Sequence, residues 1–502
     1  MMKKKFYIST AIAYPNAKPH MGHALEFIQL DCLARYHRML GEDVFASTGT
    51  DEHGVKIVKT AKQEGLTAQE LVDRNSKYFL DICDKLNISY DGFYRTTNEM
   101  LKKGAQKLWS LLEQSGDIYK DKHVGFYCYG CESFKAKKDL VDDKCPNHDR
   151  KPDYVEEENY FFRLSKYKSA LQEKLKNNEI KIYPESRKQE ILNVLEELGD
   201  VSFSRPKSVL PWGVTVPSDN SHVMYVWCDA LSNYLTGLDY LHDGENFKKY
   251  WPNDINIIGK DITRFHALYW PAMLMSAGLP LPKKIMVHGF LTSEGQKMSK
   301  TLGNVVDPID LIEKYGTDAV RYYLLREVPT LDDGDFSEER FFELYQSELA
   351  NSLGNLVNRV SSMILRYLGS EISFDSLNSK IENNLESTFK KYSKYFEELD
   401  FKKAMEEIIK LIDFSNKYIE DEKPWQLAKE NEEKLKQVLF DLVVLLEQIG
   451  ILLYPYIPNK AVELLGIFGI REEEIKFSEK FDFRKNYSVK KGEVLFPRIE
   501  KI

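Results

Sequence analysis

Two stretches of the sequence, far apart along the chain, carry residue types that suit a polyphosphate ligand. Residues 20–23 (HMGH) place two imidazoles three positions apart after an apolar run and a proline-containing loop. Residues 297–301 (KMSKT) place two lysines around a serine and just before a threonine. Imidazole N–H and ammonium groups donate to phosphate oxygens, and Gly22 allows close approach to the backbone. We therefore expect a phosphate site built from both stretches.

The elements around the histidines predict how they are positioned. Residues 6–8 read as a strand and residues 23–40 as a helix, so the loop between them leads to a helix N-terminus, where free N–H groups favour anions. A second strand at residues 44–47 and helical patterning over 55–86 follow. Alternating strands and helices predict a doubly wound parallel sheet with ligands at the carboxyl ends of its strands. Asp51 follows such an end and can face an ammonium or a ribose.

Three of the six cysteines cluster with a histidine in the middle of the chain. Cys128, Cys131, Cys145 and His148 have the spacing C-x2-C-x13-C-x2-H. Two tight knuckles with three thiolates and one imidazole suit tetrahedral Zn²⁺ and leave no position for water. We expect one structural zinc ion that holds an inserted module.

Composition places limits on the class of protein. The 502 residues are 43% hydrophobic and 29% charged, which is typical of a globular protein with several domains. No signal or transit segment follows the basic start, and residues 438–457 are interrupted by charges and a proline. We expect a cytoplasmic protein. The net charge of −8 means that any nucleic-acid surface is local.

The two phosphate stretches, with their flanking residues, resemble the HIGH and KMSKS signatures of class I aminoacyl-tRNA synthetases, and most closely the methionyl-tRNA synthetases of the bacterial type with one zinc knuckle. The similarity covers essentially the whole chain. It implies activation of methionine by ATP, with Mg²⁺, to methionyl-adenylate and pyrophosphate. Transfer of methionine to the 3′ end of tRNA(Met), for initiation and elongation, would follow.

The resemblance also implies roles for individual residues. The phosphates of ATP would be contacted by His20, Gly22, His23, Lys297, Ser299, Lys300 and Thr301, of which the two histidines and two lysines are the expected catalytic residues. Methionine would be bound by Ala11, Ile12, Tyr14, Asp51, Trp227, Ala230, Leu231, Tyr234, Ile262 and His266. Family members often have proline where this chain has Leu231. Arg205 is a further active-site candidate, with a surface arginine as the alternative.

The last third of the sequence has leucine repeats at helical spacing and predicts a helical bundle. The resemblance assigns anticodon reading to Asn355, Arg359 and Trp425; ordinary capping, surface and half-buried roles are the alternatives. The expected domains are a Rossmann-like catalytic domain at 1–116 and 223–288, a zinc-binding connective insertion at 117–222, a linking region at 289–340 and the bundle at 341–502. Because the chain stops at Ile502 without a dimerising β-barrel, we expect a monomer.

Three other classes of protein share part of these features. Synthetases for leucine, isoleucine or valine carry a large editing insertion that has no room between residues 97 and 223, and the cysteine enzyme uses zinc at its active site. A nucleotidyltransferase would not need the helical region. A zinc-knuckle RNA-binding or scaffold protein would leave the histidines and the lysines without a role.

Overall fold

The computed structural model describes residues 3–500 apart from 129–132, 136, 138–139, 147–148, 298–305 and 479–480. For residues 123–124, 133–135 and 297 only the backbone is described.

The centre of the molecule is a six-stranded sheet in the order β3-β2-β1-β12-β13-β7, with every neighbouring pair parallel. The strand order reverses between β1 and β12, which is where doubly wound folds bind ligands. This confirms the predicted fold class. The strands are β1 (Lys5–Thr10), β2 (Asp43–Thr50), β3 (Gly92–Arg95), β7 (Lys181–Tyr183), β12 (Ile255–Gly259) and β13 (Lys284–His288).

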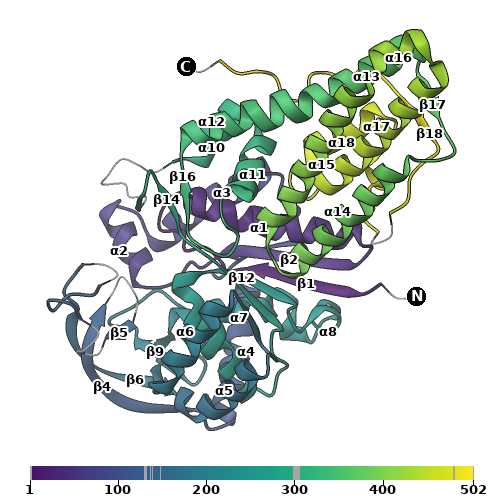
Figure 1. Ribbon diagram of the computed structural model, residues 1–502. Coiled ribbons are helices and arrows are strands. Elements are labelled where there is room, and N and C mark those ends of the chain that lie inside the picture. Colours follow the sequence, from purple (N-terminus) through teal and green to yellow (C-terminus); the bar gives the residue numbers. More distant parts are fainter. Residues whose placement is uncertain are drawn as a thin grey trace.

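Both faces of this sheet are covered by helices (Figure 1). Alternate residues of a strand point to opposite faces, so Ile8 joins one hydrophobic core while Tyr7 joins the other. The first core contains α1, α3 and α11, and the second contains α4, α7 and α9. The helices of this part are α1 (Met21–Met39), α2 (Val55–Gln63), α3 (Ala68–Lys85), α4 (Glu99–Gln114), α5 (Lys168–Lys176), α6 (Glu185–Glu196), α7 (Val226–Thr236), α8 (Glu245–Tyr250), α9 (Trp270–Ser276), α10 (Pro308–Tyr315) and α11 (Thr317–Arg326).

The region predicted as a connective insertion is built on a long β-hairpin. Strands β4 (Ile118–Cys128) and β6 (Asp153–Phe162) pair antiparallel, flanked by β5 (Ser133–Lys135) and β8 (Val201–Ser202). A second small sheet contains β9 (Ser204–Pro206), β10 (Thr215–Val216) and β11 (Asp219–Met224). The insertion is not a separate body, however, because β7 lies within it and completes the central sheet beside β13. Helices α5 and α6 pack into the same core as α7.

The last third of the chain forms a helical bundle, drawn in green to yellow in Figure 1. The prediction is confirmed, with one addition: β17 (Glu371–Ser373) and β18 (Asn486–Ser488) pair as a two-stranded ribbon. Strands β14 (Leu291–Ser293), β15 (Gln296–Lys297) and β16 (Gly334–Phe336) lie in the linking region. The bundle helices are α12 (Glu338–Leu344), the π-helix η6 (Tyr345–Gly354), α13 (Asn355–Tyr367), α14 (Ser379–Glu397), α15 (Phe401–Glu422), α16 (Pro424–Glu430), α17 (Glu432–Leu453) and α18 (Pro458–Ile467).

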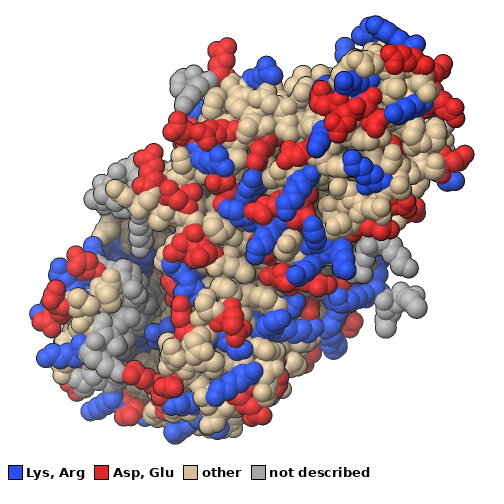
Figure 2. Space-filling model, viewed as in Figure 1, with Lys and Arg blue, Asp and Glu red and all other residues tan. Residues whose placement is uncertain are grey.

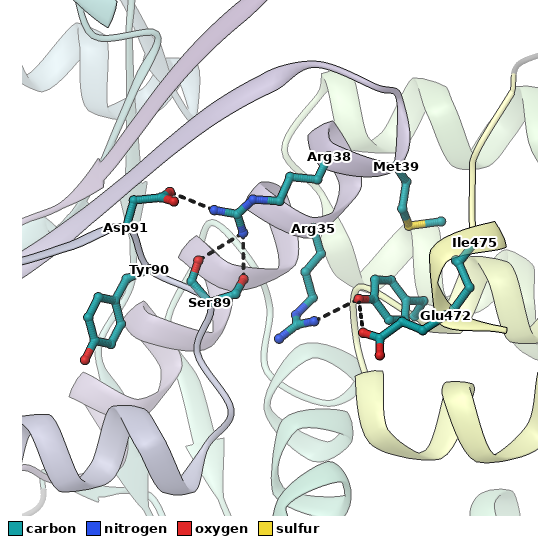
Figure 3. Close-up of a pocket in the computed structure, with 9 residues that line it drawn as sticks. Arg35, Arg38, Met39, Ser89, Tyr90, Asp91, Glu472 and Ile475 are labelled. Carbon is teal, nitrogen blue, oxygen red and sulfur yellow. Dashed lines mark hydrogen bonds and ion pairs between the residues drawn. The ribbon is translucent and has the colours of Figure 1, made fainter. Parts of the chain in front are cut away.

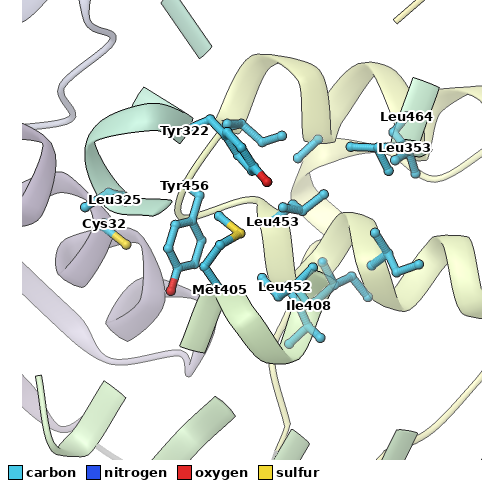
Figure 4. Close-up of a cluster of buried hydrophobic side chains, with 14 of the residues drawn as sticks. Cys32, Tyr322, Leu325, Leu353, Met405, Ile408, Leu452, Leu453, Tyr456 and Leu464 are labelled. Carbon is cyan, nitrogen blue, oxygen red and sulfur yellow. The ribbon is translucent and has the colours of Figure 1, made fainter. Parts of the chain in front are cut away.

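Helix α1 lies between the central sheet and the bundle and shares one core with both (Figure 1). In the close-up of that core, Cys32 of α1 and Leu325 of α11 face Tyr456, which follows α17 (Figure 4). Each of these side chains is at most 2% exposed. Apolar burial over this junction therefore holds the bundle to the catalytic part of the molecule.

A buried charged cluster reinforces the same junction. Arg35 Nε and Arg321 Nη2 both donate to Oδ2 of Asp31, at 2.8 and 2.6 Å. Burial raises the pKa of the Asp31 carboxyl, but the two guanidinium groups and the hydrogen bonds from Ser89 together outweigh it, and the net shift is downward. Arg321 also donates to three backbone carbonyls, those of Leu86, Pro455 and Tyr456.

A surface pocket of about 480 Å³ lies above this cluster, at the end of α1 (Figure 3). Arg35 donates to the Tyr454 hydroxyl at 3.2 Å, and Tyr454 donates to Glu472 at 2.9 Å. Arg38 is held by Ser89 and by Asp91. Each charged group that lines the pocket thus has a partner within the protein: Arg38 pairs with Asp91, Arg35 with Asp31, and Glu472 accepts from Tyr454.

Acidic and basic side chains are interspersed on the face shown in Figure 2. Several bundle lysines pair with carboxylates on the same or neighbouring helices, such as Lys403 with Asp400 and Lys391 with Glu407. Among the described residues, no helix combines the length and the apolar character needed to cross a membrane.

Candidate active site

The strand-end residues predicted from the sequence meet at the switch point of the sheet. After β1 the chain runs through residues 11–14, where Ala11 N–H donates to Ile257 O of β12 at 2.8 Å and Ala13 N–H to Gly49 O of β2 at 2.9 Å. Asp51 N–H donates back to Ala13 O at 2.8 Å. The segments that follow β1 and β2 therefore meet beside the end of β12.

His20 and His23 form the start of α1 rather than merely preceding it. Nδ1 of His20 accepts the Gly22 N–H at 3.1 Å, and Nδ1 of His23 accepts the His20 N–H at 3.2 Å. The two rings lie 3.9 Å apart and are tilted by 33°. A Cβ on Gly22 would lie 2.9 Å from Cε1 of His20, so glycine is needed for this ring position.

These contacts determine which ring nitrogen of each histidine carries the proton. Desolvation lowers the pKa of His20, and it lowers that of His23 strongly, with His20 and His288 adding to the effect. Both rings are therefore neutral at pH 7. Because each Nδ1 accepts a backbone N–H, the single proton of each ring lies on Nε2. The site thus offers two neutral N–H donors, as a phosphate site requires.

An aromatic cluster lies beside the strand ends, built from α7 and from the π-helical turn η5 (Phe265–Tyr269). Trp227 stacks on Phe265 with centroids 3.9 Å apart and planes 8° from parallel, and the edge of His266 faces the same indole at 6.1 Å. Ala230, Leu231 and Tyr234 are buried on α7. Ala11, Tyr14 and Ile262 border the same core, and Ile12 is half-buried in the loop after β1.

His266 is neutral and held in one tautomer. Its Nδ1 lies 3.1 Å from the carbonyl oxygen of Ile262, which can only accept, so Nδ1 carries the proton. Nε2 then accepts from the Tyr234 hydroxyl at 2.7 Å. Burial lowers the pKa of His266 to about 4, although the hydrogen bond to Ile262 opposes the shift.

The structure adds contacts that the sequence did not reveal. His288, at the end of β13, lies with Nε2 3.2 Å from Glu26, one turn after His23. Desolvation raises the pKa of Glu26 and opposes protonation of His288, but the carboxylate raises the pKa of His288 overall. His53 binds Asp229 of α7 at 2.5 Å. Neither pair has a local sequence signal, because 262 and 176 positions separate the partners.

The lysine stretch lies largely outside the described residues. Strands β14 and β15 lead into it, and β15 ends at Lys297, whose backbone alone is described. Ser299, Lys300 and Thr301 are not described.

Two of the four predicted zinc ligands are described. Cys128 ends β4 and Cys145 forms a β-bridge with Arg150, and both side chains are buried. Cys145 N–H donates to Arg150 O at 2.9 Å, and Asp149 N–H donates to Cys145 O at 2.8 Å. Two buried thiols fit a structural zinc site. Cys131 and His148 lie outside the described residues.

Arg205 lies on β9, within the inserted region. Its guanidinium donates to Ser202 Oγ at 2.8 Å and to Ser204 O at 2.7 Å, and it lies 4.7 Å from the Tyr127 ring centroid. Tyr225, the residue that precedes α7, lies on another side at 5.5 Å. The surface-arginine alternative is therefore wrong, because Arg205 is 4% exposed.

The three predicted anticodon residues occupy the far part of the bundle. Arg359 lies on α13 with its Cζ 5.9 Å from the Trp425 ring centroid, and it pairs with Glu420 at 2.6 Å. Trp425 is 37% exposed, and Asn355, one turn before Arg359, is exposed. A half-exposed indole beside a guanidinium is a surface on which a base can stack.

Comparisons with known proteins agree with this architecture. The family described as "tRNA synthetases class I (M)" matches residues 6–150 and 135–361, and the "Anticodon binding domain of methionyl tRNA ligase" matches residues 371–501. A methionine–tRNA ligase of Caldanaerobacter subterraneus is 45% identical over 99% of this chain and 80% of its own length. One from Brucella suis is 41% identical over 95% of this chain and 94% of its own length.

Solved structures extend the similarity to three dimensions. Mycobacterium tuberculosis methionyl-tRNA synthetase bound by methionyl-adenylate is 38% identical, with a TM-score of 0.94 over 98% of this chain and 100% of that chain. Its free form is similar with a TM-score of 0.88, at 35% identity over 100% of this chain and 99% of that chain. Family matches and full-length relatives together lead to one conclusion: the chain belongs to the methionyl-tRNA synthetases, the class I tRNA synthetases that ligate methionine to tRNA using ATP.

Proposed function

We propose that the protein activates L-methionine with ATP and transfers it to the 3′ end of tRNA(Met) for initiation and elongation. The observation that carries this proposal is the meeting of the neutral His20–His23 pair, Asp51 and the Trp227 pocket at one switch point. In the first step a carboxylate oxygen of methionine attacks the α-phosphorus of ATP, and the bond to the departing pyrophosphate breaks. In the second, a terminal ribose hydroxyl of tRNA attacks the activated carbonyl, and AMP leaves.

Methionine is held at both of its ends in this proposal. The buried Asp51 carboxylate, at the end of β2, takes the ammonium group. The thioether lies among Trp227, Tyr234 and His266, with Ala11, Ile12, Tyr14, Ala230, Leu231 and Ile262 completing the pocket. Thioether sulfur is a weak acceptor on an apolar chain, so an aromatic pocket with few polar groups selects it.

The phosphates of ATP are bound from two sides. The Nε2–H groups of His20 and His23 donate to phosphate oxygens, Gly22 allows their approach, and Lys297 and Lys300, with Ser299 and Thr301, bind the departing pyrophosphate. Such fixed donors act chiefly by stabilising charge in the transition state. Mg²⁺ accompanies ATP. Lys300→Ala should slow adenylate formation strongly and leave methionine affinity nearly unchanged; an unchanged rate would contradict this role.

The remaining residues serve tRNA and the inserted region. Asn355, Arg359 and Trp425 contact the anticodon, and the bundle at 341–502 presents them. Cys128, Cys131, Cys145 and His148 hold one structural Zn²⁺, which keeps the hairpin in position and takes no part in the chemistry. Metal analysis of Cys145→Ser protein should find zinc reduced from one equivalent to a small fraction. We further propose a cytoplasmic monomer, with the domain limits given above and with Arg205 supporting Tyr225 before the pocket helix.

The test is amino-acid-dependent exchange of labelled pyrophosphate into ATP, run with each of the twenty amino acids and no tRNA. We expect exchange with methionine alone. Exchange with a different amino acid would overturn the specificity and keep the reaction. Absence of exchange with all of them, with and without tRNA, would overturn the proposed activity.

A further inference from the structure

The loop that carries Asp51 is anchored on two sides. It runs from the end of β2 to Gly54, which precedes α2 with a φ of 103°, a value that favours glycine. Between these residues Glu52 and His53 point to different parts of the molecule and are both buried. Where Asp51 lies relative to the aromatic pocket therefore depends on what these two side chains bind.

Glu52 anchors the loop to the edge of the sheet. Its carboxylate accepts from Arg95 of β3 at 2.7 and 3.1 Å and from the Thr50 hydroxyl at 2.7 Å, and Ser76 and Thr97 donate to it as well. Its backbone N–H donates to Thr96 Oγ1 at 2.8 Å. This anchor holds the loop to β2, β3 and α3, which do not carry the aromatic pocket.

His53 anchors the loop to the pocket helix instead. Its Nδ1 lies 2.5 Å from Oδ2 of Asp229, and both side chains are 3% exposed. Asp229 belongs to the first turn of α7, two residues after Trp227 and one before Ala230. Trp212 supports the contact, because its ring lies 5.6 Å from that of His53 and its Nε1–H donates to Glu52 O at 2.7 Å.

The second oxygen of the Asp229 carboxylate indicates that the contact with His53 has a role besides stability. Oδ1 of Asp229 is buried and has no hydrogen-bond partner among the described residues. A buried, half-satisfied carboxylate is costly, and a pair retained only for stability would be expected to satisfy both oxygens. The contact is one bond between the loop of Asp51 and the helix of Trp227.

We propose that His53 and Asp229 are positioning residues that set the distance between the ammonium site at Asp51 and the thioether pocket on α7. Through this bond the loop and the helix are held at the separation that matches an α-amino acid with the side chain of methionine. The inference rests on the proposed role of Asp51. Loss of the bond lets the loop shift, so the ammonium is misplaced while the pocket and the phosphate site stay intact.

The experiment compares His53→Leu with His53→Asn in pyrophosphate exchange by the full-length protein. Leucine removes the donor, whereas asparagine can place an amide N–H where Nδ1 lies. We expect His53→Leu to raise the KM for L-methionine roughly ten- to a hundredfold, with the KM for ATP within about twofold, and His53→Asn to recover most of the loss. His37→Leu is the matched control, because His37 pairs with Glu42 at 2.7 Å at the other end of α1.

A second probe separates positioning from general damage. 4-(Methylthio)butanoate has the thioether chain and lacks the ammonium, so its inhibition constant should be the same for His53→Leu and the parent protein. Equal weakening of this analogue and of methionine, or no recovery in His53→Asn, would overturn the inference. Asp51→Asn is measured alongside. If Asp51→Asn leaves the KM for methionine unchanged, the proposed ammonium site is wrong. If Asp51→Asn raises that KM but His53→Leu does not, only the positioning role of His53 and Asp229 is refuted.

Discussion

Helix α1 carries two polar clusters that differ in one respect: how many of their hydrogen-bonding groups are used within the protein. At its N-terminus, Nδ1 of His20 and Nδ1 of His23 each accept a backbone N–H, which leaves the Nε2–H of each ring as a donor. In its middle, both oxygens of the Asp31 carboxylate accept hydrogen bonds, Oδ2 from Arg35 and Arg321 and Oδ1 from Ser89. The comparison teaches that a saturated cluster fixes the structure, whereas a cluster that keeps donors is built for a ligand.

The largest expected effect is on stability, at the saturated cluster. Asp31→Asn removes the charge between two buried guanidinium groups and should lower the free energy of unfolding by about 3–5 kcal/mol. Urea unfolding would measure it. The pair of Lys403 and Asp400 is the control, since the Lys403 side chain is 56% exposed and Lys403→Ala should change stability by less than about 1 kcal/mol. Similar effects from both variants would remove the distinction drawn between buried and exposed pairs.

A substitution in the histidine cluster should reduce the rate of reaction without reducing stability. His20→Asn retains a side-chain acceptor for the Gly22 N–H, because asparagine is a good N-cap residue, and it loses the Nε2–H. Pyrophosphate exchange should slow by roughly 10²–10³-fold, the range for one transition-state donor. The melting temperature should stay close to that of the parent. A large fall in melting temperature with full exchange activity would show that His20 serves stability and not the binding of a ligand.

The neutral His266 gives a pH-dependent prediction. Its pKa falls from an unfolded value of about 6.5 to about 4 in the folded protein, so the unfolded state binds the proton more readily. Between these values stability falls as the pH falls, by up to about 3 kcal/mol from this residue. His266→Asn should therefore weaken the loss of stability measured between pH 6.5 and 4. An unchanged pH profile would contradict the buried neutral state.

The smallest expected effect lies in the bundle. Trp425→Ala should raise the KM for tRNA about tenfold, since stacking one base on an aromatic ring contributes about 1–3 kcal/mol. Pyrophosphate exchange without tRNA should not change, because α16, which contains Trp425, lies at the end of the bundle away from α1 (Figure 1). Steady-state aminoacylation measures the first quantity. An unchanged KM for tRNA would leave the indole without the proposed role.

Local signals in the sequence predicted much of this molecule. The sequence predicts that the histidine helix begins at residue 23, within two residues of its observed start, and the apolar runs at 6–8 and 44–47 predict β1 and β2. The helical patterning over 55–86 does not by itself separate α2 from α3, but Thr67 and Glu70 form a capping box whose spacing marks the start of the second helix.

Contacts between distant segments could not be predicted in the same way. Asp31 and Arg321 are 290 positions apart, and Arg321 reads from sequence as an ordinary helix residue. The same holds for His53 with Asp229, and for β7, whose three residues join the central sheet from within the inserted region. These interactions depend on topology, which brings together residues that have no local pattern in common.

The place of β1 in the sheet also has a consequence for synthesis of the chain. One edge of β1 pairs with β2 soon after both are made, but the other pairs Ile8 with Ile255. At about 5–20 residues per second, a ribosome needs roughly 12–50 s to reach β12. During that interval the nascent chain presents an unpaired apolar strand edge, which is a site for aggregation or for chaperone binding.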